Sequence, residues 1–454
     1  MMTGMIMLVI AGCLVALARW RWGVLAAVAV ALLQDPLRKV IPGTPAYLVL
    51  ASVPIWLCAL GSAGFSGQLR IDRFFANFPR LGLWMKIFAA YLVIPAAISA
   101  TYGRNSWMIT LLGAFVYATM FLMLVAGWQY PGRSAPVQRF LVIYACMGSL
   151  LLIGGPLEAL GDQTIRPFLG TEMLGHVWVT HRTGEAVYML SGLFRSPDVM
   201  GWHASLVFMI GVILAFRAKG AARWVWMAVA VWGVLNIWLC GRRKMLAMIP
   251  VFLGCYGLFV FRFNQVRKFL SAAATAVLIL GLGWHFISSL FYSEAVERFY
   301  LTAFSEAQDQ VQRHGIDSVV GTFNQAGFWG YGLGMSQQGV HNIPDVETPR
   351  LWQESGPSKL VAELGVPGHL LFLILGAVLF ITAYQVVRLG PGKDSFHWTA
   401  GIFAILAANV TSSVVSAQIF GDPLVAFLLA FLAGMLLSGA RRTGPGPGEA
   451  EAVP

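Results

Sequence analysis

Apolar runs of close to 20 residues recur along the whole 454-residue chain, and they contain few charged side chains. About 20 helical residues cross the roughly 30 Å hydrocarbon core of a bilayer, so runs of this length predict transmembrane helices. The predicted spans are 4–18, 22–34, 45–62, 82–102, 107–127, 138–156, 198–216, 222–240, 244–262, 267–291, 364–388, 397–415 and 420–438. The first two are short and are expected to lie partly in the interface. The pattern predicts an all-α polytopic membrane protein, a bundle of 12 or 13 transmembrane helices.

Two long polar segments interrupt this pattern. They divide the chain into N-terminal helices 1–156, a first outer loop 157–197, central helices 198–291, a large loop 292–363, C-terminal helices 364–438 and a disordered tail 439–454. An outer-membrane barrel would need alternating strands of about ten residues, and the sequence has none. No internal repeat is visible, which counts against a secondary transporter built from duplicated halves.

Charge predicts the orientation of the bundle. Apolar residues make up 58% of the chain and charged residues 11%, far below the roughly 25% of a soluble domain. Alternate connections place 18 cations and 4 acids on one side, and 13 cations and 16 acids on the other. The positive-inside rule makes the first side cytoplasmic, with the C-terminus. The large loop and Arg242–Arg243 then lie outside, and the net charge of +11 reflects topology without a nucleic-acid-binding patch.

The five cysteines all fall within apolar runs, and none lies in the large loop. Their number is odd and their spacing matches no metal site, so we interpret them as small core residues. The cysteine pattern therefore predicts no metal centre.

The large loop is predicted to be partly helical. Apolar positions recur every three or four residues from Val296 to Val311, with charged residues between them, which predicts an amphipathic helix. A second helix is expected at about 316–326. Glycines follow at 330, 332 and 334. They allow either a flexible turn or a close approach of the backbone to a ligand.

Four stretches, taken in order, resemble the O-antigen ligase/polymerase superfamily. Ser191–Asp198 (SGLFRSPD) is similar to a Gly-x-Phe-x-x-Pro-Asn segment, and Gly241–Ala247 (GRRKMLA) to a Ser-Arg-x-x-Leu-Leu-Ala segment. Gly330–Gly334 (GYGLG) and Ala362–Gly368 (AELGVPG) follow, the second leading into an apolar span. The resemblance covers about 187–370, and the N-terminal third is similar in hydropathy alone.

The resemblance implies a GT-C-like, metal-independent membrane glycosyltransferase on the outer face of a bacterial inner membrane. Such an enzyme transfers a glycan from a polyprenyl-diphosphate carrier to an acceptor, without a cofactor. The acceptor is another carrier-linked glycan in a polymerase and a lipid core in a ligase. Implied partners are the carrier-linked donor and acceptor, membrane lipids and other polysaccharide-assembly proteins.

The cationic residues Arg242, Arg243 and Lys244 begin a span on the outer side, where positive charge is disfavoured. Arg242 and Arg243 either bind the carrier diphosphate or extend to lipid headgroups, and the resemblance favours the diphosphate, with Lys244 as a weaker helper. Arg195 is a second candidate for an anion contact, or it pairs with Asp198 or Glu185 in the loop.

The candidate general base is Glu354. It stands where the ligase branch has a His-Asn pair before Glu-Leu-Gly, and a carboxylate in a partly dry cavity can deprotonate a sugar hydroxyl. The alternatives are an ordinary solvated acid at this position and His341 as the base. The replaced histidine slightly favours a polymerase over a ligase.

The remaining candidates belong to the substrate loop: Arg313, Lys359 and the glycines Gly330, Gly332 and Gly334. A solvated helix face, or pairing with Glu306 and Asp309, is the simpler interpretation of that arginine. Trp178 could stack on a sugar or anchor the interface.

Two functions of other classes remain open. A transporter or flippase for lipid-linked glycan would need ionisable residues near the middle of the membrane, and the predicted spans have few acids there. A non-catalytic scaffold of a polysaccharide export complex is the other alternative.

Overall fold

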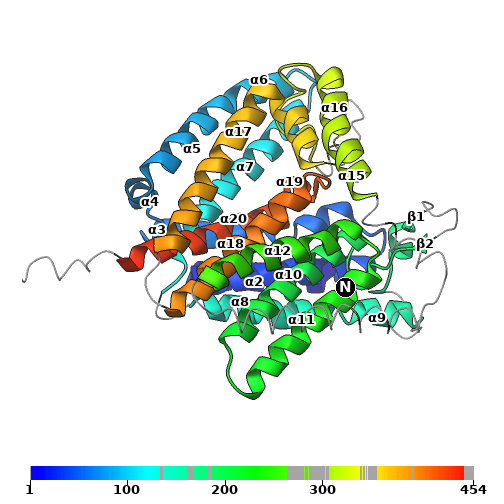
Figure 1. The fold of residues 1–454 in the computed structure, drawn as a ribbon. Coiled ribbons are helices and arrows are strands. Elements are labelled where there is room, and N and C mark those ends of the chain that lie inside the picture. The colour runs from blue at the N-terminus through cyan, green and yellow to red at the C-terminus, as the bar shows by residue number, and fades with distance from the viewer. Residues whose placement is uncertain are drawn as a thin grey trace, which may run out of the picture.

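The computed structural model shows a bundle of helices with one very short sheet (Figure 1). It describes residues 2–132, 136–161, 168–180, 187–262, 281, 285, 302, 306–337, 340, 343, 345, 355–389 and 393–443. The predicted span 267–291 lies outside these residues, apart from positions 281 and 285. The two candidate bases, Glu354 and His341, also lie outside them.

The N-terminal helices agree with the predicted spans to within a few residues. They are α1 (Met2–Ala18), α2 (Trp20–Lys39), η1 (Ala46–Leu50), α3 (Val53–Phe65), α4 (Ile71–Asn77), α5 (Pro79–Tyr91), α6 (Val93–Ser99), α7 (Ser106–Gln129), α8 (Val137–Leu151) and α9 (Gly154–Ala159). Proline at the first or second position of α3 and α5 suits a helix start, where a backbone N–H has no partner within the helix.

The central part contains a small hairpin and three long helices. These elements are η3 (Glu172–Leu174), β1 (Val179–Thr180), β2 (Val187–Tyr188), α10 (Pro197–Arg217), α11 (Ala221–Leu239) and α12 (Arg243–Arg262). The two strands are antiparallel, with Val179 opposite Tyr188 and Thr180 opposite Val187.

The C-terminal part begins inside the predicted large loop. Its elements are α15 (Ala307–Gln310), the π-helical η4 (Val311–Asp317), α16 (Ser318–Ala326), α17 (Gly356–Leu389), α18 (Lys393–Ser413), α19 (Gln418–Gly421), α20 (Pro423–Leu437) and η6 (Ser438–Thr443). The helix expected at about 316–326 is α16. The span expected at 364–388 is part of α17, which begins earlier, at Gly356.

Within the described residues, nine helical segments are long and apolar enough to cross a membrane. The protein is therefore an all-α, multi-pass membrane protein. α1 is a shorter apolar helix. The predicted spans 22–34 and 397–415 are helical, as parts of α2 and α18, but they are not among the nine.

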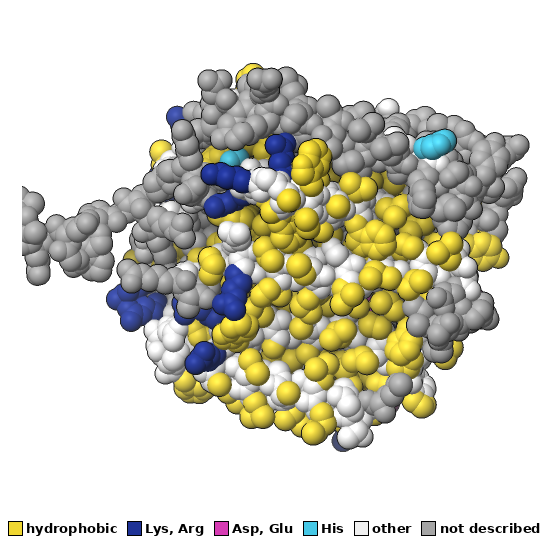
Figure 2. All heavy atoms as spheres, turned by 90° about the horizontal axis from the view of Figure 1, so that it is seen from below, with side chains coloured by type: hydrophobic (Ala, Val, Ile, Leu, Met, Phe, Trp, Pro, Cys, Tyr) yellow, Lys and Arg dark blue, Asp and Glu magenta, His cyan; other side chains and the backbone are white. Residues whose placement is uncertain are grey.

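The bundle has two ends, which we name by their contents. The tail end is where α20 finishes and η6 follows, and the loop end carries β1, β2, α15 and α16 (Figure 1). Seen from below, most described side chains are hydrophobic, and Lys and Arg gather towards the tail end (Figure 2). This distribution fits a surface that faces lipid along its length.

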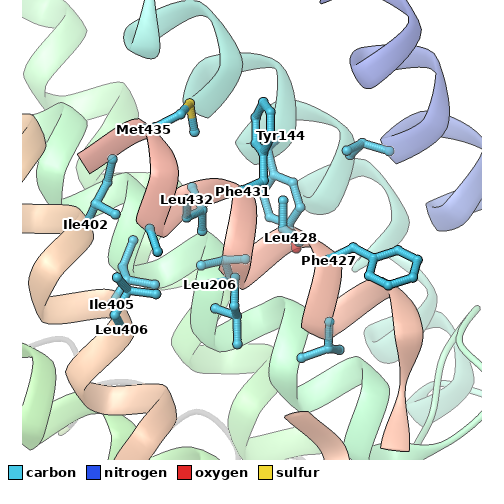
Figure 3. Close-up of a cluster of buried hydrophobic side chains, with 14 of the residues drawn as sticks. Tyr144, Leu206, Ile402, Ile405, Leu406, Phe427, Leu428, Phe431, Leu432 and Met435 are labelled. Carbon is cyan, nitrogen blue, oxygen red and sulfur yellow. The ribbon is translucent and has the colours of Figure 1, made fainter. Parts of the chain in front are cut away.

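The core is centred on α10 and α20, which are the most deeply buried spans. α20 lies among α8, α10 and α18, and its Phe427, Phe431 and Leu432 pack against residues such as Tyr144 and Leu206 (Figure 3). Glycines allow α20 to approach α7 closely. A Cβ at Gly127 or Gly434 would overlap the backbone of the other helix.

Candidate functional site

α17 is interrupted near its start, at the loop end. Gly365 has φ 65° and ψ −177°, so the helix breaks after Leu364 and resumes. The backbone groups around the break are hydrogen-bonded: Val366 N donates to Phe328 O at 2.9 Å, and Leu364 O accepts from Tyr91 Oη at 2.6 Å. A break is tolerable in a buried span because these partners replace the helical ones.

The predicted glycine loop packs against this break. Gly330, Gly332 and Gly334 have φ values of 74°, 101° and 86°, which favour glycine. A Cβ on Gly330 would lie 2.7 Å from Gly365 N, and Cβ atoms on the other two would overlap the backbones of α6 and α7. The glycines are explained by close approach to helices, which neither the flexible-turn nor the ligand interpretation anticipated.

Glu363 is fully buried just before the break and accepts three hydrogen bonds. Tyr117 Oη donates at 2.9 Å, Ser336 N at 3.1 Å and Gln337 Nε2 at 3.4 Å. Lys359, one helical turn earlier, is also buried and lies 3.5 Å from Gln337 Oε1. The structure thus places Lys359 inside α17, where it offsets the charge of Glu363, instead of in a solvated loop.

Arg195 joins two distant segments of the chain. Its guanidinium contacts Asp35 Oδ1 at 3.2 Å and also pairs with Asp422, the N-cap of α20. Burial alone would lower the pKa of Arg195. The two carboxylates raise it by more than burial lowers it, so the pKa lies above the ordinary value. The sequence suggested neither Asp35 nor Asp422 as a partner, and Glu185, one of the two acids that it did suggest, lies outside the described residues.

A lysine and a glutamate hold the segment that leads to Arg195. Lys39 Nζ donates to Gly192 O at 2.9 Å, and Glu158 Oε2 accepts from Ser191 N at 2.9 Å and Gly192 N at 2.5 Å. Burial lowers the pKa of Lys39 to about 8, although Asp35 and Glu158 oppose the shift. This segment is thus fixed by a buried lysine and a partly buried glutamate.

Arg242 and Lys244 share one carboxylate at the start of α10. Arg242 NH2 lies 2.8 Å from Asp198 Oδ2, and Lys244 Nζ lies 2.6 Å from Asp198 Oδ1. Both cations keep about a fifth of their side-chain surface exposed, at 21% and 22%. Two cations against one acid leave a local excess of positive charge.

The guanidinium of Arg242 has a further donor and an aromatic neighbour. Its Nε–H has no hydrogen-bond partner among the described residues. Its Cζ lies 4.9 Å from the ring centroid of Trp178, within the range of a cation–π contact. Trp178 therefore orients this arginine, a role that neither sugar stacking nor interface anchoring anticipated.

Arg243 points elsewhere. Its NH1 lies 2.6 Å from Glu306 Oε2, and its NH2 donates to Thr302 Oγ1 at 2.8 Å. Arg243 thus ties α12 to the predicted large loop, while Arg242 and Lys244 face α10. The structure separates the arginine pair that the sequence placed together on one ligand.

Arg313 matches the simpler interpretation of the sequence. It is 73% exposed and lies 3.8 Å from Asp309. An exposed pair of this kind contributes little to stability.

The first turns of four helices meet at the loop end. Asp198 links α10 to α12, Arg195 links the approach to α10 with Asp422 of α20, and electrostatic contact links Asp422 with Lys359 of α17. Helix N-termini carry partial positive charge and so favour anions. The described residues hold no cluster of His, Cys, Asp and Glu able to bind a metal. The arrangement suits an anionic ligand.

The sequence alone predicted no role at the site for four of these residues: Asp35, Tyr117, Glu363 and Asp422. Asp422 offered a signal, because it is an acid inside the predicted span 420–438. Tyr117 offered none, because tyrosine is ordinary in an apolar helix.

Comparison of the sequence with protein-family models and with curated proteins gave no match.

Proposed function

We propose that this protein is a membrane glycosyltransferase that polymerises polyprenyl-diphosphate-linked oligosaccharides into exopolysaccharide or O-antigen. One observation carries the proposal: Arg242 and Lys244 share a single carboxylate and remain partly exposed at a helix start. Such a group offers fork-like donors and net positive charge to a diphosphate. The resemblance of residues 187–370 to the O-antigen ligase/polymerase superfamily supplies the substrate class.

The proposed orientation puts the loop end on the outer face of a bacterial inner membrane. The gathering of Lys and Arg towards the tail end supports a cytoplasmic tail, because cytoplasmic connections carry the excess of these residues. The cationic group at the start of α12 then meets carrier-linked glycans on the outer side.

In the proposed mechanism, Arg242 and Lys244 bind the diphosphate and stabilise the charge that develops on it. The acceptor hydroxyl attacks the anomeric carbon and loses its proton to the base, Glu354 or His341. The bond from the anomeric carbon to the phosphate oxygen breaks, and polyprenyl diphosphate leaves with the electron pair. A single displacement inverts the anomeric configuration.

Arg195 and Lys359 have supporting parts in this proposal. Lys359 is buried, Arg195 is only 10% exposed, and both face acids, so they hold the helix starts in register and leave ligand contact to Arg242 and Lys244. Arg243 positions the large loop through Glu306. Transfer to a lipid core, as in a ligase, needs the same groups with a different acceptor.

A glycan transporter is the second candidate, favoured by the broken α17 and its buried Lys359 and Glu363. The part of α17 after Gly365 still provides more than the roughly 20 residues that cross the hydrocarbon core. The buried pair can therefore lie beyond that core, away from the midpoint where a transport site is expected. This placement favours the enzyme.

The test is chain growth by the purified protein with lipid-linked repeat units, with no nucleotide or ion gradient supplied. We expect Arg242→Ala and Lys244→Ala to lower the rate at least about tenfold, the effect of losing one charge-assisted contact. Glu354→Gln tests the proposed base. Arg104→Ala, an exposed arginine between α6 and α7, is the matched control and should retain the parental rate. If the parent shows no chain growth but translocates the glycan in vesicles, the protein is a transporter and the glycosyltransferase proposal is wrong.

A further inference from the structure

A second cationic region lies at the tail end, at the other end of the bundle from Arg242 and Lys244. A cavity of about 410 Å³ opens there between α1, α2, α3 and α8. Three arginines line it, Arg19, Arg21 and Arg139, and no acid is among the described residues that do so. The cavity therefore concentrates positive charge.

Arg21 is held in place by neutral acceptors. Its Nε donates to Tyr130 O at 2.9 Å and its NH2 to Gln129 O at 3.2 Å, while NH1 lies 3.4 Å from Gln68 Oε1. Carbonyl oxygens orient a guanidinium without neutralising it. Burial lowers the pKa of Arg21, and Tyr130 opposes this shift.

Tryptophans orient the arginines on both sides of the cavity. Arg21 Cζ lies 4.8 Å from the ring centroid of Trp20, and Arg139 Cζ lies 4.3 Å from that of Trp22. Trp20 is itself fixed, because its Nε1 donates to Gln68 Oε1 at 2.7 Å. Arg19, on the connection between α1 and α2, is exposed. Two of the three cations are thus positioned by stacking before any ligand arrives.

One side of the cavity continues into lipid-facing surface. Leu17 and Trp22 line the cavity and are 56% and 41% exposed, and Leu14 of α1, 62% exposed, lies one helical turn before Leu17. An acyl chain can lie along these side chains while a polar headgroup occupies the cavity. Neither free water nor a soluble anion would make use of this apolar rim.

Among the described residues, no acid lines the cavity. Asp72 on α4 is exposed and is not one of the lining residues, and Arg70 and Arg73 lie close to it in the sequence. The described lining residues therefore carry net positive charge.

We infer that this cavity binds the phosphate headgroup of an anionic phospholipid from the leaflet at the tail end. Guanidinium forks match phosphate oxygens, aromatic residues favour the membrane interface, and the apolar rim accepts the acyl chain. The ligand would clamp α1 and α2 against α8. The inference needs a multi-pass membrane protein and does not depend on the glycosyltransferase proposal.

The test uses the full-length protein in lauryl maltoside micelles, with thermal unfolding followed during titration with dioleoylphosphatidylglycerol. Parallel titrations use dioleoylphosphatidylcholine and inorganic phosphate. We expect a saturable rise in Tm with phosphatidylglycerol alone, because binding to the folded state stabilises it. Arg19→Gln and Arg139→Gln should each weaken the apparent affinity about tenfold. Arg73→Gln, an exposed arginine outside the cavity, is the control and should change it less than about twofold.

Three results would overturn the inference. Equal stabilisation by phosphatidylcholine would show that the headgroup charge is not recognised. Equal stabilisation by inorganic phosphate would assign the cavity to a soluble anion. If Arg73→Gln lost as much affinity for phosphatidylglycerol as the two cavity variants, the binding would reflect general surface charge and not the cavity. Arg19 is exposed, so its substitution leaves the fold intact and keeps the test decisive if Arg139→Gln fails to fold.

Discussion

Tyr117 on α7 donates a hydrogen bond of 2.9 Å to Glu363 on α17, across 246 positions of sequence. Both side chains are buried, and Ser336 N adds a second donor from the glycine loop. One carboxylate thus joins a transmembrane helix, a broken helix and the loop that fills the break. The contact fixes the loop-end geometry on which the proposed diphosphate contact depends.

We expect Tyr117→Phe to destabilise the protein by roughly 1.5–3 kcal/mol, because a buried carboxylate loses a charge-assisted hydrogen bond. Glu363→Ala should cost more, about 3–5 kcal/mol, since it leaves Lys359 buried without its acid. Unfolding in detergent measures both. Tyr188→Phe is the control, as Tyr188 is 67% exposed, and it should be close to neutral. Equal stability of Tyr117→Phe and the parent would remove the structural role of this contact.

Gly365→Ala should lower stability by about 2 kcal/mol or more. Its φ of 65° disfavours a side chain, and a Cβ would overlap the backbone of Phe328 and Trp329. Gly376→Ala in the same helix is the matched control, because a Cβ there meets nothing within 4 Å. It should be neutral or stabilising by about 0.5–1 kcal/mol. If both variants unfold at the same temperature, α17 is not broken at Gly365.

Lys39 gives a pH dependence whose sign follows from its lowered pKa. The pKa is about 8 in the folded protein and 10.5 for the free side chain, so between these values the unfolded chain binds more protons. The free energy of unfolding therefore rises with pH between about 8 and 10.5. Below about pH 8 the contribution of Lys39 to it does not change with pH. Raising the pH from 8 to 10.5 should therefore increase the Tm of the parent relative to the Tm of Lys39→Met. A difference independent of pH would mean that Lys39 stays charged.

Asp198→Asn tests the shared carboxylate. Removing the acid frees Arg242 and Lys244, so we expect tighter binding of polyprenyl diphosphate together with lower stability of the apoprotein. The affinity and the Tm of the same preparation measure the two effects. Weaker binding would show that Asp198 organises the cations and does not compete with the ligand.

Hydropathy was enough to predict the long apolar helices of the described residues, such as α7 and α10, because a helix that crosses a membrane is apolar along most of its length. It could not predict the pairing of Arg195 with Asp35 and Asp422, which are 160 and 227 positions away. The early start of α17 was hidden for a different reason. The polar Ser358, Lys359 and Glu363 resemble loop residues. The burial of Lys359 and Glu363 depends on partners supplied by α7, α20 and the glycine loop.

The candidate site was predicted in part. Charge at a helix start indicated Arg242 and Arg243, with Lys244 as a weaker helper, but neighbours in sequence need not face one ligand. Arg243 leaves the helix in another direction and binds Glu306. Similarly, spacing alone could not show that Gly330, Gly332 and Gly334 meet helix backbones.

The most direct measurement is the affinity of the purified protein for polyprenyl diphosphate, compared with polyprenyl monophosphate. We expect a preference for the diphosphate that Arg242→Ala and Lys244→Ala each reduce at least about tenfold, while Arg104→Ala leaves it unchanged. Undiminished binding in both variants, or no preference for the diphosphate in the parent, would contradict it.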